Sequence, residues 1–232
     1  MPLPKPQLPI FNLEIPSTGQ RVTFRQFTVR EEKVLIQAKE HDDINIMKNA
    51  IKQIISSCVT GIENVDDLTL FDVEYILTKI RAKSVGEIVE LTMPCDADPK
   101  HDRINVQINL DEIHVTTPEG HSKNVLLYDD VGIALKYPSI DDVDKIEDVS
   151  EFDAIILCVD YIYTGEEVFL AKEQTREELV EFLESLTQKQ IEKIDAVFFR
   201  TMPEFKHEFS YKCPTCGHEH SKVIKGLSNF FT

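Results

Sequence analysis

Residues 68–95, with the sequence LTLFDVEYILTKIRAKSVGEIVELTMPC, carry the pattern that decides the fold. Thr69 and Asp72 have the spacing of a capping box, in which a hydroxyl and a carboxylate satisfy free amides of the first helical turn. An apolar stripe at helical spacing follows, made of Leu70, Val73, Leu77 and Ile80. After Gly86, the residues from Ile88 to Met93 are typical of a strand. The stretch therefore predicts a capped helix, a turn and a strand that ends at Cys95.

The same pattern recurs 118 residues further along the chain, where Thr69 corresponds to Thr187 and Cys95 to Cys213. The second copy has its own capping box, formed by Thr187 and Gln190. Other positions keep their character under this shift, and they include Val73 with Ile191, Glu74 with Glu192, Ile76 with Ile194, Ile80 with Phe198 and Leu91 with Phe209. We interpret the repeat as an internal duplication. It predicts an α+β fold of two similar lobes, each made of helices and a terminal β-hairpin, with a zinc-ribbon-like second hairpin.

The chain divides at a polar stretch between residues 111 and 124. Residues 1–10 contain four prolines and predict an extended arm. We expect a first lobe over residues 11–115 and a second lobe over residues 124–232. In the second lobe, the apolar run at 152–163 predicts a helix that ends near Gly165.

Composition limits the possible functions. The net charge of −16 argues against a phosphate backbone or an anionic membrane as the main partner, because both attract basic surfaces. The acidity serves either solubility or the binding of a basic partner protein. No apolar run is long enough to cross a bilayer, and the N-terminus lacks the features of a signal peptide. Five cysteines, two of them inside apolar runs, favour a reducing cytoplasm over a disulfide framework.

The second hairpin carries the sequence CPTCGHEH at residues 213–220, which has the pattern of a zinc knuckle. Two thiolates separated by two residues can bind one ion, and the following glycine permits the tight turn. Cys213 and Cys216 are therefore predicted ligands of one structural zinc ion. The remaining ligands are expected from the nearby histidines or from the first hairpin, and the candidates are His218, His220, Cys95 and His101.

The same cysteines have two other interpretations. The motif is also compatible with a β-turn that carries two free thiols, and with a redox dithiol. The strand-like flanks argue against the redox reading, because thioredoxin-like dithiols open a helix. The sequence contains no glycine loop for phosphate, no nucleophile elbow and no His-Glu-x-x-His helix, so we expect a protein without enzymatic activity or small-molecule substrate.

At residues 70–77 and 80–87 the sequences LFDVEYIL and IRAKSVGE resemble the central signature of the baseplate hub assembly proteins of T-even-type tailed phages. The segments PSTGQRVTFRQFTVREEK at 16–33 and INVQINLDEI at 104–113 are similar to that family as well. The resemblance implies a late viral protein that helps to build, or forms part of, the hub of a contractile-tail baseplate. Its expected partners are other hub proteins, and its expected location is the host cytoplasm during assembly, with possible retention in the virion. The family offers no catalytic residues.

A basic helix end lies inside this signature. Lys79, Arg81 and Lys83 precede the turn formed by Ser84, Val85 and Gly86. They complement the negative end of the helix dipole, and we expect Arg81, Lys83, Ser84 and Gly86 to contact a hub partner as well. A second functional hypothesis is a zinc-ribbon adaptor that docks a host or viral protein.

Overall fold

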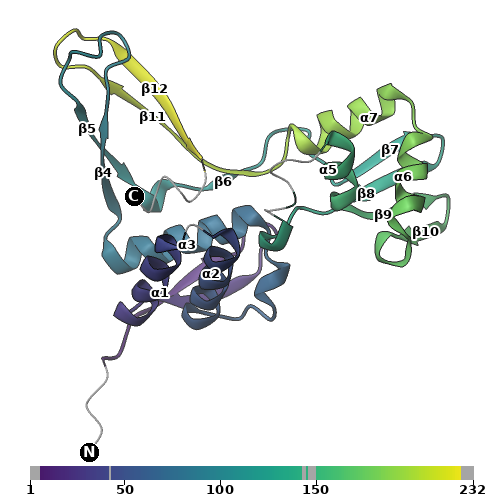
Figure 1. Ribbon diagram of the computed structural model, residues 1–232, viewed down its shortest axis with the longest axis horizontal. Coiled ribbons are helices and arrows are strands. Elements are labelled where there is room, and N and C mark those ends of the chain that lie inside the picture. Colours follow the sequence, from purple (N-terminus) through teal and green to yellow (C-terminus); the bar gives the residue numbers. More distant parts are fainter. Residues whose placement is uncertain (1–5, 42, 143–144, 146–149, 226–232) are drawn as a thin grey trace, which may run out of the picture. The chain divides into compact units, whose positions relative to one another are not determined.

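The computed structural model describes residues 6–41, 43–142, 145 and 150–225 (Figure 1). The chain forms two compact units, and each is described by itself. Unit 1 comprises residues 1–116 together with residues 204–232, and unit 2 comprises residues 117–203. Of the predicted arm at residues 1–10, residues 1–5 lie outside the described part, and the first strand already begins at Ile10.

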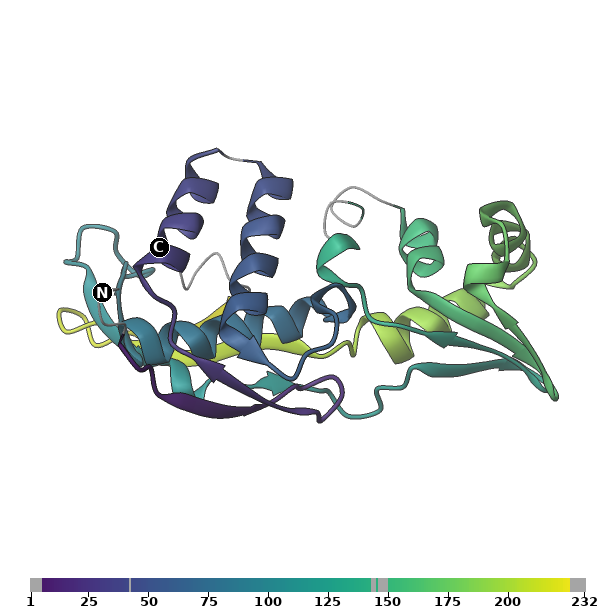
Figure 2. The ribbon, with the colours of Figure 1, turned by 90° about the horizontal axis from the view of Figure 1, so that it is seen from below.

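The first layer of unit 1 is an antiparallel sheet. Strands β1 (Ile10–Glu14), β2 (Arg21–Arg25) and β3 (Val59–Thr60) follow one another in the order β1-β2-β3. Helices α1 (Val29–Glu40) and α2 (Ile44–Cys58) stand side by side as an antiparallel pair beside this sheet (Figure 2). Alternation along β1 and β2 buries Leu13, Val22 and Phe24 and leaves their neighbours to solvent.

Helix α3 (Leu70–Val85) is the central element of unit 1. The predicted capping box is present, because the Thr69 hydroxyl accepts a hydrogen bond from the amide of Asp72 and the Asp72 carboxylate accepts one from the amide of Thr69. Asp72 is fully buried and also accepts a hydrogen bond of 2.9 Å from the amide of Ser17. One carboxylate therefore begins the helix and holds the β1–β2 turn against it.

Two long hairpins complete unit 1. The first consists of β4 (Ile88–Met93) and β5 (Ile104–Asn109), and the second consists of β11 (Glu204–Lys212) and β12 (Glu219–Lys225). The short strand β6 (Val115–Thr116) pairs with the start of β11, where Val115 faces Phe205 and Thr116 faces Glu204. Short 3-10 turns lie at Val65–Asp67, between β3 and α3, and at Leu110–Glu112, between β5 and β6.

Unit 2 is a four-stranded antiparallel sheet with helices on one side. Strands β7 (Asn124–Tyr128), β8 (Val131–Leu135), β9 (Val159–Thr164) and β10 (Glu167–Leu170) follow in that spatial order. Helices α5 (Glu151–Cys158), α6 (Arg176–Glu184) and α7 (Gln188–Ile194) pack on it, and α7 continues into a π-helical turn at Asp195–Phe199. The core between the layers includes Ile133, Ile155 and Phe198, all fully buried. Further 3-10 turns lie at Ile140–Asp142 and Ala171–Glu173.

The structure divides the chain differently from the expected lobes at 11–115 and 124–232. The hairpin of β11 and β12 belongs to unit 1 and lies beside the hairpin of β4 and β5, so unit 2 has no terminal hairpin of its own. The pairing of β11 with β6 accounts for this, because it returns the chain to unit 1 directly after residue 203. The expectation that each lobe would be a contiguous half of the chain was wrong.

A second difference concerns the helix expected at 152–163. The helix ends at Cys158, and residues 159–164 form strand β9 between β8 and β10. Val159, Ile162 and the two tyrosines of this segment are β-branched or aromatic and fit a pleated surface between two neighbouring strands. Unit 1 has the same local arrangement, since α2 ends at Cys58 and leads directly into β3.

Candidate metal centre

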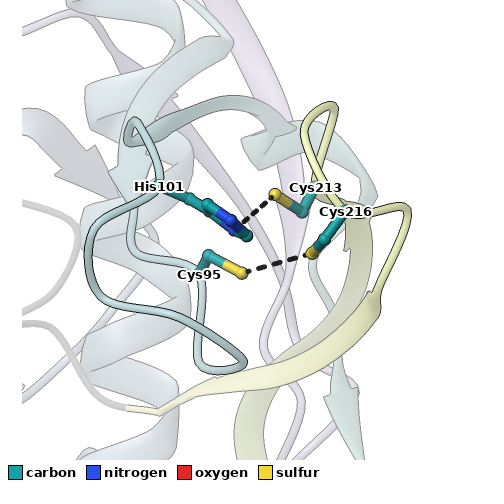
Figure 3. Close-up of side chains that lie close together, drawn as sticks. All are labelled: Cys95, His101, Cys213 and Cys216. Carbon is teal, nitrogen blue, oxygen red and sulfur yellow. Dashed lines mark hydrogen bonds between the residues drawn. The ribbon is translucent and has the colours of Figure 1, made fainter.

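The tips of the two hairpins of unit 1 bring together four metal-ligating side chains. Cys95 follows β4, His101 lies in the loop before β5, and Cys213 and Cys216 lie in the turn between β11 and β12 (Figure 3). Their ligand atoms all lie within 4.8 Å of one another. Cys95 and Cys213 are almost fully buried, and neither forms a disulfide.

The closest distances agree with a tetrahedral zinc site. A tetrahedron with zinc–sulfur bonds of about 2.3 Å and zinc–nitrogen bonds of about 2.0–2.1 Å has sulfur–sulfur edges of about 3.8 Å and sulfur–nitrogen edges of about 3.6 Å. The Sγ atoms of Cys95 and Cys216 are 3.8 Å apart, and Cys213 Sγ is 3.6 Å from His101 Nδ1. Three cysteines and one histidine are a common donor set of structural zinc sites, so the residues present fit this ion.

Both tips fold as knuckle turns. In the second hairpin, the amides of Thr215 and Cys216 donate to the sulfur of Cys213, and the amide of Gly217 donates to the carbonyl of Cys213. Gly217 has a φ of +75°, a conformation that favours glycine. In the first hairpin, the amides of Ala97 and Asp98 donate in the same way to the sulfur of Cys95. The first turn thus keeps the backbone of a knuckle although Asp98 occupies the place of a second cysteine.

These hydrogen bonds favour thiolates, the form of cysteine that binds metal. The amides of Cys216 and Thr215 lower the pKa of Cys213 to about 6. Burial opposes ionisation of Cys95, but hydrogen bonds from His101 and from backbone amides lower the pKa of this thiol as well. At Cys216 the amide of His218 favours the thiolate, but burial and the neighbouring thiols outweigh it and raise the pKa. A cation at the centre would offset that repulsion.

A polar contact region joins the two hairpins beside the cluster. The hydroxyl of Tyr211 donates to the carbonyl of Pro94 at 3.0 Å, and Lys222 forms an ion pair of 2.6 Å with Asp96. This ion pair lowers the pKa of Asp96. His220 is buried, stacks on Tyr211 and lies 3.6 Å from Asp96. These residues flank Cys95 and Cys213, so they hold the four ligand-bearing side chains in register.

The predicted ligands divide into two groups. Cys95, Cys213 and Cys216 lie in the cluster, whereas His218 is exposed and His220 packs against Tyr211 and Asp96. The fourth position is taken by His101. The sequence signal for His101 was its place six residues after Cys95 in the first hairpin tip. His218 and His220 are closer in sequence to the Cys-x-x-Cys pair, so they were equally plausible ligands. His218 lies between Gly217 and β12, and His220 lies on β12, beyond the turn that the ligands occupy.

The predicted partner-binding residues have different environments. Arg81 is half-buried, its pKa is lowered by burial, and it forms no ion pair or hydrogen bond within the described part of the chain. Lys83 forms an ion pair with Asp111. The Ser84 hydroxyl donates to the carbonyl of Ile80 and accepts from the amide of Phe27, and Gly86 ends α3 with a φ of +139°.

Lys79, one of the three basic residues near the end of α3, does not face solvent. Its side chain is buried, and its ammonium group donates to the carbonyls of Leu110, Asp111 and Ile113 at 2.8–3.1 Å. The 3-10 turn at Leu110–Glu112 packs on α3 and covers the Lys79 side chain, so this position is buried together with the apolar face of the helix. Lys79 is therefore an internal support of the turn after β5.

The fold and the cluster define a class of protein: an α+β chain in which two hairpin tips bring together three cysteines and one histidine that could hold a metal ion. Residues 8–232 match the family model described as T4 bacteriophage base plate protein, so the chain belongs to that family. It is 28% identical over 213 residues to the baseplate hub assembly protein gp26 of Enterobacteria phage T4, an alignment that covers 90% of this chain and 92% of that protein. No solved structure matches the chain. In the described residues, no helix has the length and apolarity needed to span a bilayer.

Proposed function

We propose that this protein is a non-enzymatic factor or subunit in the assembly of the baseplate hub of a contractile phage tail. The observation that carries the proposal is the match to the base plate family over residues 8–232, together with the likeness to a hub assembly protein along nearly its whole length. The buried thiols and the coupled hairpins support a structural role for the Cys/His cluster. Its partners are then other hub proteins, in the host cytoplasm during assembly and in the baseplate if the chain is retained.

The experiment is reconstitution of the hub by co-expression. The other hub proteins of the same phage are produced with and without this chain, and the complexes are separated by sedimentation and analysed for composition. We expect a defined hub complex only when the chain is present. Equal yields of the same complex without the chain would contradict the proposal. The presence or absence of the chain in the final complex distinguishes a subunit from a transient assembly factor.

The cluster of Cys95, His101, Cys213 and Cys216 binds one structural zinc ion in this proposal. Elemental analysis of protein purified without chelator is expected to give one zinc per chain. Cys213→Ser should abolish the bound metal, whereas Cys58→Ala, which removes a buried thiol near β3, should leave it unchanged. Zinc-free protein in which the thiols of Cys95, Cys213 and Cys216 all react freely would contradict the assignment. His101→Ala should weaken zinc binding far more than His218→Ala, and this comparison tests the fourth ligand.

Arg81 is the residue of the basic helix end best suited to a partner contact. No described residue gives the half-buried guanidinium of Arg81 a counter-charge, so it can form a bidentate contact with a carboxylate of a partner. Lys83 is already paired with Asp111, so its reversal would place two carboxylates side by side and is not a clean test. Arg81→Glu should leave thermal unfolding near that of the parent and reduce recovery of hub complexes. Arg30→Glu, on the exposed side of α1, is the matched control and should not reduce it.

We further infer that the two halves arose by duplication. Support comes from the common order of elements: a β-hairpin, a helix that ends in cysteine and enters the third strand, a helix with a threonine capping box, and a hairpin with a knuckle turn. In this interpretation, the hairpin of the second copy has joined that of the first copy through the shared metal site. A solved structure in which α3 with β4 and α7 with β11 do not superpose would argue against it.

A further inference from the structure

The outer face of the sheet in unit 2 has an unusual composition. Val125, Ile133 and Ile162 point to the helices and form the core. Figure 2 shows these helices on one side of the strands. Residues directly opposite each other in an antiparallel sheet share a face. The register therefore places one row on the outer face across all four strands, made of Leu126, Gly132, Tyr163 and Val168. A second row follows, made of Asn124, Ala134, Tyr161 and Leu170.

This outer face is apolar and partly exposed. Leu126 and Val168 are 49% and 55% exposed at the two ends of the row, and the tyrosines between them are half-buried. The ring of Tyr163 lies directly on Gly132, since a Cβ atom at that position would be only 2.2 Å from the ring. The glycine thus lets the aromatic ring lie flat on the backbone of β8. Apart from Asn124, the two rows therefore consist of aromatic and aliphatic side chains and one glycine.

The sheet of unit 1 provides an internal comparison. It has the same antiparallel order of a hairpin followed by a third strand, and its outer row consists of Asn12, Thr23 and Thr60. That row is polar, as expected for a sheet face in contact with water. The strand arrangement alone therefore does not demand an apolar outer face. In unit 2 the apolar row adds exposed hydrophobic area, which typically marks an interaction site.

Four carboxylates that form no ion pair with any described residue lie at one end of this sheet. The turns between β7 and β8 and between β9 and β10 meet at one end of the sheet, where the amide of Gly165 donates to the carbonyl of Asp130. Asp129 and Asp130 lie in the first turn, Glu166 lies in the second, and Glu167 is the first residue of β10; all four are exposed. None of the four forms an ion pair in the part of the chain that the structure describes. Unit 2 is also the acidic part of the molecule, with 20 Asp and Glu against 8 Lys and Arg, compared with 21 against 17 in unit 1.

We propose that the outer face of this sheet, bordered by these four carboxylates, docks a partner protein that presents an apolar strip flanked by lysine or arginine. An apolar centre with a charged rim is the usual anatomy of a protein interface, and opposite charge on the partner would speed and orient association. A nucleic acid is disfavoured, because its phosphates would meet the carboxylates. The inference rests on the proposed function in one respect: the partner is a hub protein.

The test measures binding of the full-length chain to each purified hub protein of the same phage, by titration calorimetry at low and high salt. Two variants probe the face. The first combines Leu126→Glu with Val168→Glu and places charges in the apolar row. The second changes all four carboxylates, Asp129, Asp130, Glu166 and Glu167, to lysine. We expect one basic hub protein to bind the parent, with affinity that falls as salt increases, and each variant to bind it at least tenfold more weakly. Hydrogen exchange in the complex should show protection in β7, β9 and β10.

Matched control variants test whether added or reversed charges weaken binding regardless of their place on the molecule. Asn12→Glu with Thr23→Glu places the same charges on the outer face of the unit 1 sheet, and Glu177→Lys with Glu181→Lys changes charge on α6. Both should bind like the parent, and all variants should unfold near the parent's temperature. Parent-like binding by both test variants would overturn the docking surface and leave the proposed function intact. A parent that binds no hub protein would overturn both.

Discussion

At the scale of single residues, Glu31 links helix α1 to the sheet of unit 1. Its carboxylate accepts hydrogen bonds from Arg25 at 2.9 Å and from the amide of Thr28 at 2.7 Å. Burial opposes ionisation, but these bonds outweigh it and lower the pKa of Glu31 from 4.5 to about 2. The unfolded chain therefore takes up the proton first as pH falls. The stability that Glu31 contributes is present above about pH 4.5 and is lost as pH approaches about 2.

Glu31→Gln tests this dependence. At neutral pH the variant should lose about 2 kcal/mol of unfolding free energy, because the charged hydrogen bonds are weakened. The difference from the parent should shrink steadily when denaturant titrations are repeated at lower pH within that window. Glu32→Gln, on the exposed side of the same helical turn, should show little difference at any pH. A gap between Glu31→Gln and the parent that stays constant down to strongly acidic pH would exclude the assigned role.

Lys79 gives a second test at this scale. Lys79→Met keeps the length of the side chain but leaves three backbone carbonyls without their donor, and we expect a loss of about 3 kcal/mol. Lys83→Met removes only a partly exposed ion pair with Asp111 and should cost less than about 1 kcal/mol. Urea titrations of the two variants measure the difference. Equal losses would show that the buried ammonium group does not support the turn after β5.

At the scale of elements, two capping boxes allow the stability contributed by the helix cap itself to be compared with that contributed by a long-range contact. The box of α3 is buried and its Asp72 also holds the amide of Ser17, whereas the box of α6, formed by Thr175 and Glu178, is exposed. Asp72→Ala should cost about 3 kcal/mol, since it leaves buried amides unpaired, and Glu178→Ala should cost about 1 kcal/mol or less. Thermal unfolding of both variants tests the contrast, and similar costs would mean that the Ser17 contact contributes nothing.

Elements with local signals could be predicted from the sequence. The helices that begin after Thr28, Thr69 and Thr187 have their caps, and strands such as β5 show their alternation, within a few residues of sequence. The segment at 159–164 could not be assigned this way, because an apolar run is compatible with a helix or a buried strand. Its pairing with β8, a strand whose residues are more than twenty positions earlier, decides the outcome.

The candidate site shows the same difference between residues with a local sequence signal and residues placed by tertiary contacts. The Cys-x-x-Cys pattern is local, and it identified Cys213 and Cys216. The fourth ligand depends on the docking of two hairpins, since Cys213 and His101 are separated by 112 residues. The place of His101 after Cys95 makes it a candidate, but the linear sequence does not rank it above His218 or His220. The burial and stacking of His220 on Tyr211, which remove it from the cluster, likewise depend on tertiary contacts.

At the scale of the whole molecule, metal removal should affect one unit only. All four residues of the cluster belong to unit 1, whereas the core of unit 2 contains none of them. Because metal binding at such a site is folding free energy of the elements it joins, a zinc chelator should increase hydrogen exchange in β4, β5, β11 and β12. Exchange in α5, α6 and β9 should stay unchanged. Equal acceleration in both units would contradict an independent core in unit 2.

The pairing of β6 with β11 has a consequence for the history and engineering of the chain. Thr116 and Glu204 are paired across that ladder, so the chain leaves unit 1 and returns to it at adjacent positions. Unit 2 could therefore be deleted as one segment. An Asn-Gly turn between Thr116 and Glu204 would then join β6 and β11 as an ordinary β-hairpin. A genome could therefore lose, exchange or diversify the acidic unit without rebuilding the scaffold that carries the Cys/His cluster. Adaptation to a new assembly partner would then require replacement of a module rather than redesign of a fold.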